Sequence, residues 1–225
     1  MAWYNRESVV KFESPCTITL VASSNSGKTT FVKRLLQHAD GMFTEPITKI
    51  LYCYGSKWQD IFDDMSRIFP KLSFKEGLPA DDDLTELTGG ESRAHTCLVL
   101  DDLSSQIYTN KDLEKLWTAD SHHKRMTIIH LTHNLFPKSP SGRIISLNTK
   151  YFIIFRNHRD ALQIKHFARQ VYPNKVGFFM ASYHKAVEDQ WGYLVVDLHG
   201  RSNEKYRLRT KIFPNEDMLI FQPNH

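Results

Sequence analysis

The sequence predicts an α/β fold in which helices cover both faces of a mainly parallel central sheet and the C-terminal edge is rich in strands. Two observations predict it. Short, almost continuously apolar runs alternate along the chain with longer segments whose apolar residues recur at helical spacing. Continuous apolar runs of this kind are typical of strands buried on both faces of a parallel sheet. We expect one domain over residues 1–225, with its core over about 16–173 and a C-terminal extension over about 174–225.

The predicted elements follow in order along the chain. Apolar, β-branched runs predict strands over residues 17–22, 47–54, 96–100, 126–131 and 151–155. Helical spacing predicts helices over residues 29–38, 58–68, 110–119, 160–172 and 176–188. Residues 79–93 are acidic and contain glycine, so we expect a surface excursion with one or two helical turns. Residues 193–198 and 206–213 alternate like antiparallel or edge strands.

Composition and charge narrow the class of protein. The 225 residues carry 29 Lys and Arg against 25 Asp and Glu, a formal charge of +4, and the 41% that are hydrophobic suffice for one core. The three cysteines lie in separate apolar runs, so we expect them to be buried and reduced. No apolar run approaches the ~18 residues of a membrane span, and the N-terminus lacks the apolar stretch of a signal peptide. We therefore expect an intracellular protein without a membrane partner.

A phosphate-binding loop is predicted between the first strand and the first helix. The segment fits the pattern G/A-x-x-x-x-G-K-S/T, and the expected nucleotide-binding residues are Ala22, Ser23, Ser24, Asn25, Ser26, Gly27, Lys28, Thr29 and Thr30. In such a loop, backbone N–H groups surround a β-phosphate at a helix N-terminus. Gly27 lets the backbone come close, Lys28 bridges the β- and γ-phosphates, and the Thr29 hydroxyl ligates Mg²⁺. ATP and Mg²⁺ are thus the expected cofactors; the alternative is a serine-rich turn with a chance Gly-Lys-Thr.

Two adjacent carboxylates end the third predicted strand. A phosphate-loop enzyme needs an acidic residue at the end of a neighbouring buried strand to hold the metal. Asp101 is the expected magnesium partner, and Asp102 is placed to polarise an attacking water. Such a pair at the tip of an apolar strand is costly unless a cation lies there. The alternative is a pair of helix N-cap residues.

The fourth predicted strand ends in Thr132-His133-Asn134. ATPases with an additional strand of this kind place a polar sensor of the γ-phosphate at its tip. Either Asn134 or His133 would fill that role here, and the alternative is an ordinary polar residue that caps the strand.

Four segments carry a family resemblance. They are SSNSGKTT, LVLDDL, SHHKR leading into MTIIHLTHNLF, and RIISLNTKYFIIFRNHRDALQIKHFARQVYP. Over about residues 18–173 the chain resembles the FtsK–HerA class of P-loop ATPases, and more narrowly the genome-packaging ATPases of poxviruses, adenovirus-like elements and Polinton-type transposons. The resemblance implies a RecA-like P-loop NTPase that forms a homo-oligomeric ring and uses ATP hydrolysis to translocate double-stranded DNA, in viruses into a preformed capsid.

The same resemblance implies further site residues and partners. The family places an arginine that acts on the neighbouring subunit's nucleotide at the start of the strand after the acidic motif, where Arg125 stands; Arg143 is the second candidate. In the family a Gln commonly precedes the sensor Asn, whereas this chain has His133, so His133 and Asn134 stay as alternatives. A capsid protein is a further possible partner, and the expected location is the host cytoplasm or nucleus, or the virion.

A run of basic residues near the C-terminus is a candidate DNA contact. It contains Arg201, Lys205, Arg207, Arg209 and Lys211, of which the last three would share one face of a strand. The alternative is a solvated charged face. Further candidates for contact with DNA phosphates are Arg156, Arg159, Lys165 and Arg169.

Two other functions share the phosphate loop. A small-molecule kinase would need a lid and an acceptor pocket, and the Asp-Asp tip followed by another strand with a polar end argues against it. A nucleotide-gated binding protein would use ATP only to switch its affinity for a partner.

Overall fold

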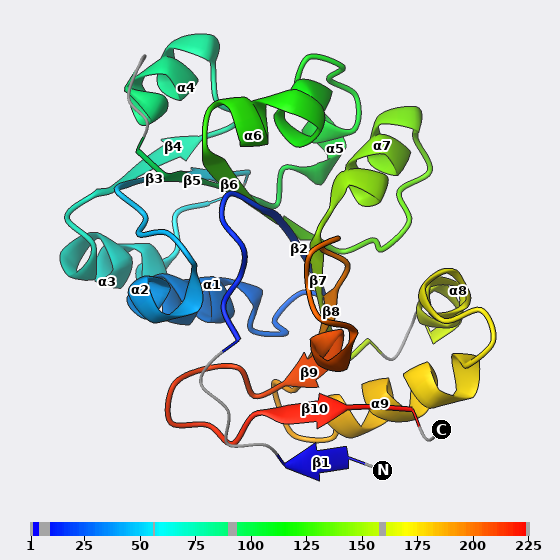
Figure 1. The fold of residues 1–225 in the computed structure, drawn as a ribbon. Helices are drawn as coiled ribbons and strands as arrows, with labels where there is room; N and C mark the ends of the chain where they lie inside the picture. Colours follow the sequence, from blue (N-terminus) through cyan, green and yellow to red (C-terminus); the bar gives the residue numbers. More distant parts are fainter. Residues whose placement is uncertain (1, 5–9, 56, 90–93, 158–160, 224–225) are drawn as a thin grey trace.

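The computed structural model describes residues 2–4, 10–55, 57–89, 94–157 and 161–223. In this part of the chain ten strands form one sheet, in the order β1-β10-β9-β8-β7-β2-β6-β5-β3-β4, with helices on both faces (Figure 1). The predicted α/β fold class is confirmed. The sheet has a parallel half and an antiparallel half, which meet at β7.

The parallel half carries the phosphate loop. Across the sheet its strands are β7 (Tyr151–Phe155), β2 (Thr17–Val21), β6 (Met126–Thr132), β5 (Thr96–Asp101), β3 (Lys49–Tyr54) and β4 (Leu72–Glu76). Val21 is level with Thr132 of β6, and Asp101 is level with Tyr54 of β3. Because these strands run in one direction, their carboxyl ends meet at one edge of the sheet.

The antiparallel half forms the predicted strand-rich C-terminal edge. Its strands are β8 (Tyr193–Asp197), β9 (Leu208–Thr210), β10 (Leu219–Phe221) and β1 (Ala2–Tyr4). The expected strand over residues 206–213 is shorter than predicted. A 3₁₀ turn, η2 (Glu204–Tyr206), precedes it, and Lys211 has φ +55°, which takes the backbone out of the extended region.

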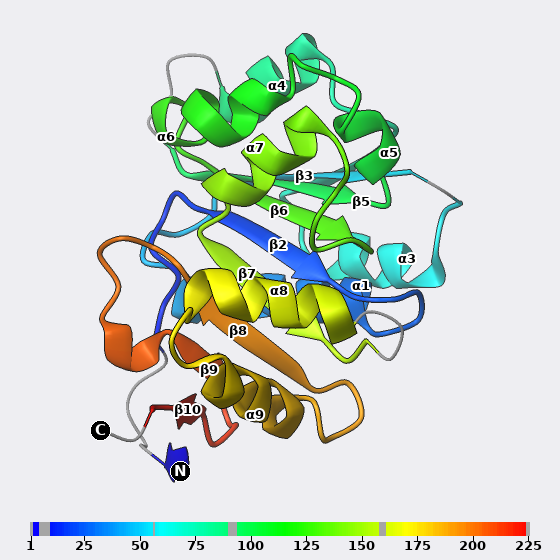
Figure 2. The ribbon, with the colours of Figure 1, turned by 90° about the vertical axis from the view of Figure 1, so that its right-hand side faces the viewer.

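The helices form two layers. One face is covered by α1 (Lys28–Gln37), α2 (Ala39–Met42) and α3 (Asp60–Ile68). The other face carries α4 (Asp81–Thr88), α5 (Ser104–Ile107), the π-helical η1 (Leu116–Asp120), α6 (Ser121–His123), α7 (Pro140–Asn148), α8 (Ala161–Val171) and α9 (Val176–Ala186). Figure 2 shows α8 and α9 over the strands at the junction of the two halves.

Strand β7 shows why the sheet is covered on both faces. All five of its residues are buried. Tyr151, Ile153 and Phe155 pack in the core under α1, while Phe152 and Ile154 pack in the core under α8 and α9. Alternate residues of a strand point to opposite faces, so a continuous apolar run needs a layer on each side. The three cysteines are buried and unpaired, as expected.

Several elements differ from the sequence prediction. The helix expected at 110–119 lies further along the chain, since the helical residues run over 114–123. Strands β1, β4 and β10 and helices α2, α5 and α7 were not predicted. Expected elements that begin at Asp160 or extend over 90–93 lie partly outside the described residues. Within the described ranges, no helix combines the length and apolar character that crossing a bilayer requires.

Candidate nucleotide-binding site

The phosphate loop follows β2 and ends at the first residue of α1. Gly27 is the N-cap of α1 with φ +85°, a left-handed conformation that glycine adopts without steric cost. Ser24 to Thr30 line a cavity of about 1100 Å³ at the carboxyl edge of the parallel half. Ala22 is fully buried, and Ser23 lies beside it with its hydroxyl 2.7 Å from that of Ser26. The predicted strand, loop and helix therefore form a concave surface at the N-terminus of α1, where a helix leaves backbone N–H groups without intrahelical partners.

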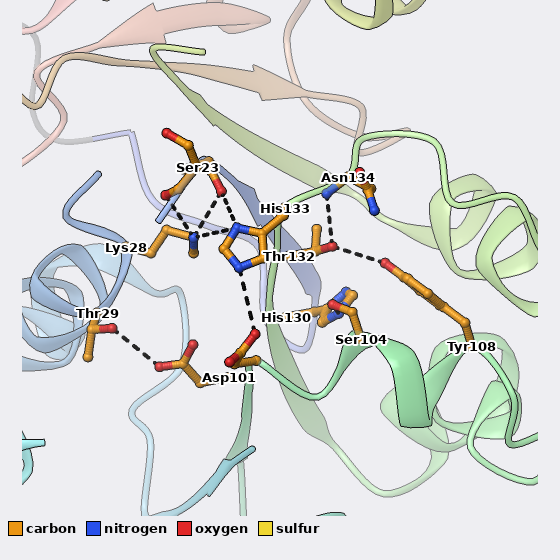
Figure 3. A network of polar contacts seen from close by, with 12 residues as sticks. Ser23, Lys28, Thr29, Asp101, Ser104, Tyr108, His130, Thr132, His133 and Asn134 are labelled. Atoms are coloured by element: carbon orange, nitrogen blue, oxygen red, sulfur yellow. Dashed lines mark hydrogen bonds and ion pairs between the residues drawn. The ribbon is translucent and has the colours of Figure 1, made fainter. Parts of the chain in front are cut away.

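Lys28 lies at the centre of this surface. Its Nζ donates to the carbonyl oxygens of Ala22 at 2.9 Å and Ser23 at 3.1 Å, and lies 3.3 Å from Nδ1 of His133 (Figure 3). Partial burial lowers the pKa of Lys28, and the charges of Asp101 and Asp102 oppose that effect. A cation held by neutral carbonyls in a partly dry site is well prepared to bind an anion.

Asp101 ends β5 and is only 5% exposed. Its Oδ2 accepts hydrogen bonds from the Tyr52 hydroxyl at 2.6 Å and from the Thr29 hydroxyl at 3.3 Å. Burial raises the pKa of Asp101, although these two hydrogen bonds and the charge of Lys28 act against the rise. Within the described residues Asp101 makes no ion pair. A buried carboxylate beside a hydroxyl, both of them hard oxygen donors, fits a magnesium ion.

Asp102 lies one residue further, at the cavity. Its backbone has φ +57°, and its carbonyl oxygen packs so closely on Gly55 that a Cβ there would lie 2.2 Å away. Glycine is thus required at the end of β3. The Asp102 side chain is largely exposed, with Oδ1 3.6 Å from Nε2 of His133.

The structure separates the two candidate sensors. His133 lines the cavity, with Nδ1 2.8 Å from the Ala22 carbonyl oxygen. Asn134 points away from Lys28, and its backbone N–H donates to Thr132 Oγ1 at 3.2 Å (Figure 3). Of the two, His133 is the one in position to contact a bound phosphate.

Neither candidate arginine belongs to the described lining of this cavity. Arg125 precedes β6 at the opposite, amino-terminal edge of the sheet and forms an ion pair with Glu45. Arg143 is exposed in the first turn of α7, and in the described part of the chain its guanidinium makes no ion pair.

The basic run near the C-terminus does not form one exposed face, so that expectation is wrong. Arg209 is fully buried and donates to Asp197 Oδ2 at 2.9 Å. Arg207 pairs with Glu204, and Lys211 pairs with Asp189 at 3.2 Å. These side chains serve the structure of the antiparallel half or its loops.

The other candidate DNA contacts differ in their surroundings. Arg156 is half-buried, and its Nε donates to the Val187 carbonyl at 2.7 Å. Lys165 and Arg169 are exposed on α8. Arg159 lies outside the described residues.

Two site residues were missed at the sequence level. Tyr52 reads as an ordinary apolar position of β3, yet its hydroxyl holds Asp101. Trp191 precedes β8, and its ring lies against the phosphate loop, where a Cβ on Gly27 would be 3.2 Å from Trp191 Cε3. The strand that contains Tyr52 lies next to the strand that ends in the acidic pair, and this position could have identified Tyr52 as a site residue. Nothing in the sequence indicated the position of Trp191.

The sequence matches no known protein family and no curated protein. Solved structures do match. The genome-packaging NTPase B204 of Sulfolobus turreted icosahedral virus 2, in complex with ATP-gammaS, superposes with a TM-score of 0.53 at 14% identity, over 93% of this chain and 98% of that one. The chain therefore shares the fold of this NTPase.

A second structure supports the same fold. The cytoplasmic domain of the type VII secretion ATPase EccC of Thermomonospora curvata superposes with a TM-score of 0.52 at 11% identity. The match covers 94% of this chain and 25% of the EccC chain, so this chain spans about a quarter of that one.

Proposed function

We propose that this chain is an ATP-hydrolysing motor that translocates double-stranded DNA, as in the packaging of a viral or virus-like genome. One observation carries the proposal: Lys28, Thr29 and Asp101 converge at the carboxyl edge of a sheet whose fold matches nearly the whole of a viral packaging NTPase. That neighbour holds an ATP analogue, which supports ATP as the ligand of this cavity.

Each residue at the phosphate end has a distinct proposed role. The backbone N–H groups of the loop hold the phosphates, and Lys28 neutralises charge between the β- and γ-phosphates. Thr29 and Asp101 would hold Mg²⁺, which when bound offsets the charge that develops on the phosphate oxygens. Asp102 and His133, 3.6 Å apart, orient the attacking water beside the γ-phosphate. Burial of Asp101 restricts its access to bulk water, so an ion there would interact with it strongly.

The proposal includes a homo-oligomeric ring in which a neighbouring subunit completes the site with an arginine. An exposed guanidinium without an ion pair can reach another subunit more easily than one already paired, so Arg143 now ranks ahead of Arg125. DNA, a capsid protein, the single-domain organisation and a location inside the host cell or virion belong to the same proposal.

The test is an ATPase assay with and without duplex DNA. We expect the wild-type chain to show multiple turnovers that DNA stimulates, and Lys28→Ala to lose on the order of 100-fold or more in rate. Lys33→Ala is the matched control, because Lys33 lies in the same helix but pairs with Asp64 on the surface of α3.

Other outcomes would favour the rival functions. Phosphate transfer to a nucleoside or another small acceptor without DNA stimulation would identify a kinase. A single turnover that DNA leaves unchanged would identify a nucleotide-gated binding protein.

The arginines are tested in the same assay. We expect Arg143→Ala to bind ATP normally and to lose DNA-stimulated hydrolysis, while Arg125→Ala keeps it. The reverse result would return Arg125 to first place, and normal rates in both variants would exclude the two of them.

A further inference from the structure

The cavity extends beyond the phosphate end. Sheet order gives its direction. Strands β6, which His133 follows, and β5, which ends in Asp101, lie on one side of the phosphate-loop strand β2, whereas β7 and β8 lie on the other. A nucleotide whose γ-phosphate faces the first side must extend its nucleoside towards the second. The described lining residues on that second side are Arg34, Phe155, Trp191, Tyr193 and Phe213.

Among these aromatic side chains, Trp191 differs in exposure. Phe155 and Phe213 are each 2% exposed and Tyr193 is 7% exposed, so their rings are committed to the core. Trp191 is 57% exposed, and the six-membered part of its indole lies against Gly27. A large aromatic surface is therefore open at the rim of the cavity, next to the loop that would hold the phosphates.

The segment that carries Trp191 is held in place from three sides. The Arg156 guanidinium donates to the carbonyl oxygens of Val187 and Glu188, and Asp189 pairs with Lys211. Gly192 packs so closely on the preceding helix end that a Cβ there would lie 2.6 Å from the Ala186 carbonyl oxygen. Trp191 itself has φ +65°, a left-handed conformation that a bulky residue adopts only when its surroundings impose it. The backbone that carries the ring is thus held beside the phosphate loop, with the indole against Gly27.

We propose that Trp191 is the stacking surface for the nucleobase of the bound nucleotide. The inference rests on the proposed function, because it takes the phosphate loop to hold a nucleoside triphosphate. Bases stack on aromatic side chains through their flat faces, and every base has such a face. A ring that already lies beside the phosphate loop loses little conformational entropy when the base binds.

The polar side chains near Trp191 limit how specifically the site can recognise the base. The Tyr193 hydroxyl accepts from the Ile212 N–H at 3.1 Å, and Arg34 is paired with Glu216 and stacked on Phe213. The Tyr193 hydroxyl and one amino group of Arg34 are therefore held by protein partners, which leaves few polar groups on this side to contact the base edge. Stacking without hydrogen bonds to the base edge discriminates weakly, so we expect GTP to bind within about ten-fold of ATP, and pyrimidine nucleotides to bind less tightly because they stack over a smaller area.

The experiment compares the affinity of the full chain for ATP with its affinity for inorganic tripolyphosphate, which has the phosphates but no base. We expect Trp191→Ala to weaken ATP binding about ten-fold and to leave tripolyphosphate binding unchanged. Trp191→Phe should retain most of the ATP affinity, because it keeps an aromatic face. Trp58→Phe is the matched control, since Trp58 is also a half-exposed cavity tryptophan but lies on the β3–α3 side and donates to Asp63.

Two results would overturn the inference. Equal weakening of ATP and tripolyphosphate by Trp191→Ala would mean that the ring only supports the phosphate loop, and no weakening of either would remove it from the site. Indole emission gives a second measurement: the part of the signal lost in Trp191→Phe should respond to ATP and not to tripolyphosphate. If the wild-type chain binds neither ligand, the proposed function fails instead, which is a distinguishable outcome.

Discussion

Two buried aspartates, one in each half of the sheet, have opposite surroundings. Asp197 ends β8 and is 2% exposed; it accepts from the guanidinium of Arg209 and from the backbone N–H of His199. Asp101 ends β5 and is 5% exposed; among the described residues its carboxylate accepts only from the hydroxyls of Tyr52 and Thr29. The antiparallel half supplies its own cation. The parallel half leaves its carboxylate without an ion pair, although the charge of Lys28 acts on it, and this arrangement costs stability and creates a place for a cation brought by a ligand.

The largest effect on stability is expected where Arg209, the buried cation of the antiparallel half, would lose its partner Asp197. Asp197→Asn removes the charge opposite the fully buried Arg209, so the unfolding free energy should fall by about 3–5 kcal/mol. Asp189→Asn is the control, because it breaks an exposed pair with Lys211 and should cost no more than about 1 kcal/mol. Urea unfolding measures both, and equal losses would mean that burial does not distinguish the two pairs.

His130, a buried histidine of strand β6 in the parallel half, should make stability depend on pH. Burial lowers the pKa of His130 to about 4, so its neutral form stabilises the fold at neutral pH, and that contribution disappears as pH falls from 6.5 to about 4. The full shift in the pKa of His130 corresponds to about 3 kcal/mol of unfolding free energy.

His130→Gln cannot titrate, so its stability should fall less steeply than that of the wild type across this window. Denaturant unfolding at several pH values measures the two slopes. Parallel slopes would show that another group causes the acid sensitivity.

A smaller effect is expected where the two halves touch. Gly27→Ala places a Cβ at φ +85° and 3.2 Å from the Trp191 ring, and should cost about 1–2 kcal/mol. In a Trp191→Ala background, the part of this cost that comes from the contact with the indole should disappear. A double-mutant cycle measures this coupling. A cycle that shows no coupling would mean that the indole moves away at no cost.

The smallest expected change has the opposite sign. Burial raises the pKa of Asp101 above that of the unfolded chain, so its ionisation reduces stability as pH rises through the folded-state pKa. Asp101→Asn should therefore raise the melting temperature of the nucleotide-free protein at neutral pH, and the gain should fade below the ordinary Asp pKa. It should also remove the stabilisation by magnesium and ATP that we expect in the wild type. A melting temperature below that of the wild type would contradict the view that the unpaired Asp101 carboxylate costs stability.

The features whose position in the fold could be predicted from the sequence are those with a local signal. The phosphate loop and Asp101 follow from a motif between a strand and a helix, and each central strand is a short apolar run. Helix α7 also had a local signal that the prediction did not use, since the Ser139 hydroxyl accepts from the Gly142 N–H and proline follows it. Strand β4 had none: it is a half-exposed edge strand with no continuous apolar run.

Other features depend on partners far along the chain. The pairing of Arg209 with Asp197 turns an apparent basic face into an internal ion pair. The choice between His133 and Asn134 depends on how the backbone leaves β6, and the position of Trp191 depends on a loop fixed by Arg156. Alternating charge or an isolated tryptophan carries no information about such contacts.

The position of β2 also sets the order in which this chain can be completed during synthesis. Thr17 pairs with Ile128 of β6, and Ile18 pairs with Tyr151 of β7, so both neighbours of this early apolar strand leave the ribosome long after it. Until then the strand has two unpaired edges that can associate with other chains. Trp191 and Phe213 follow later still and also line the cavity, so the complete cavity forms only after both halves of the sheet have been synthesised.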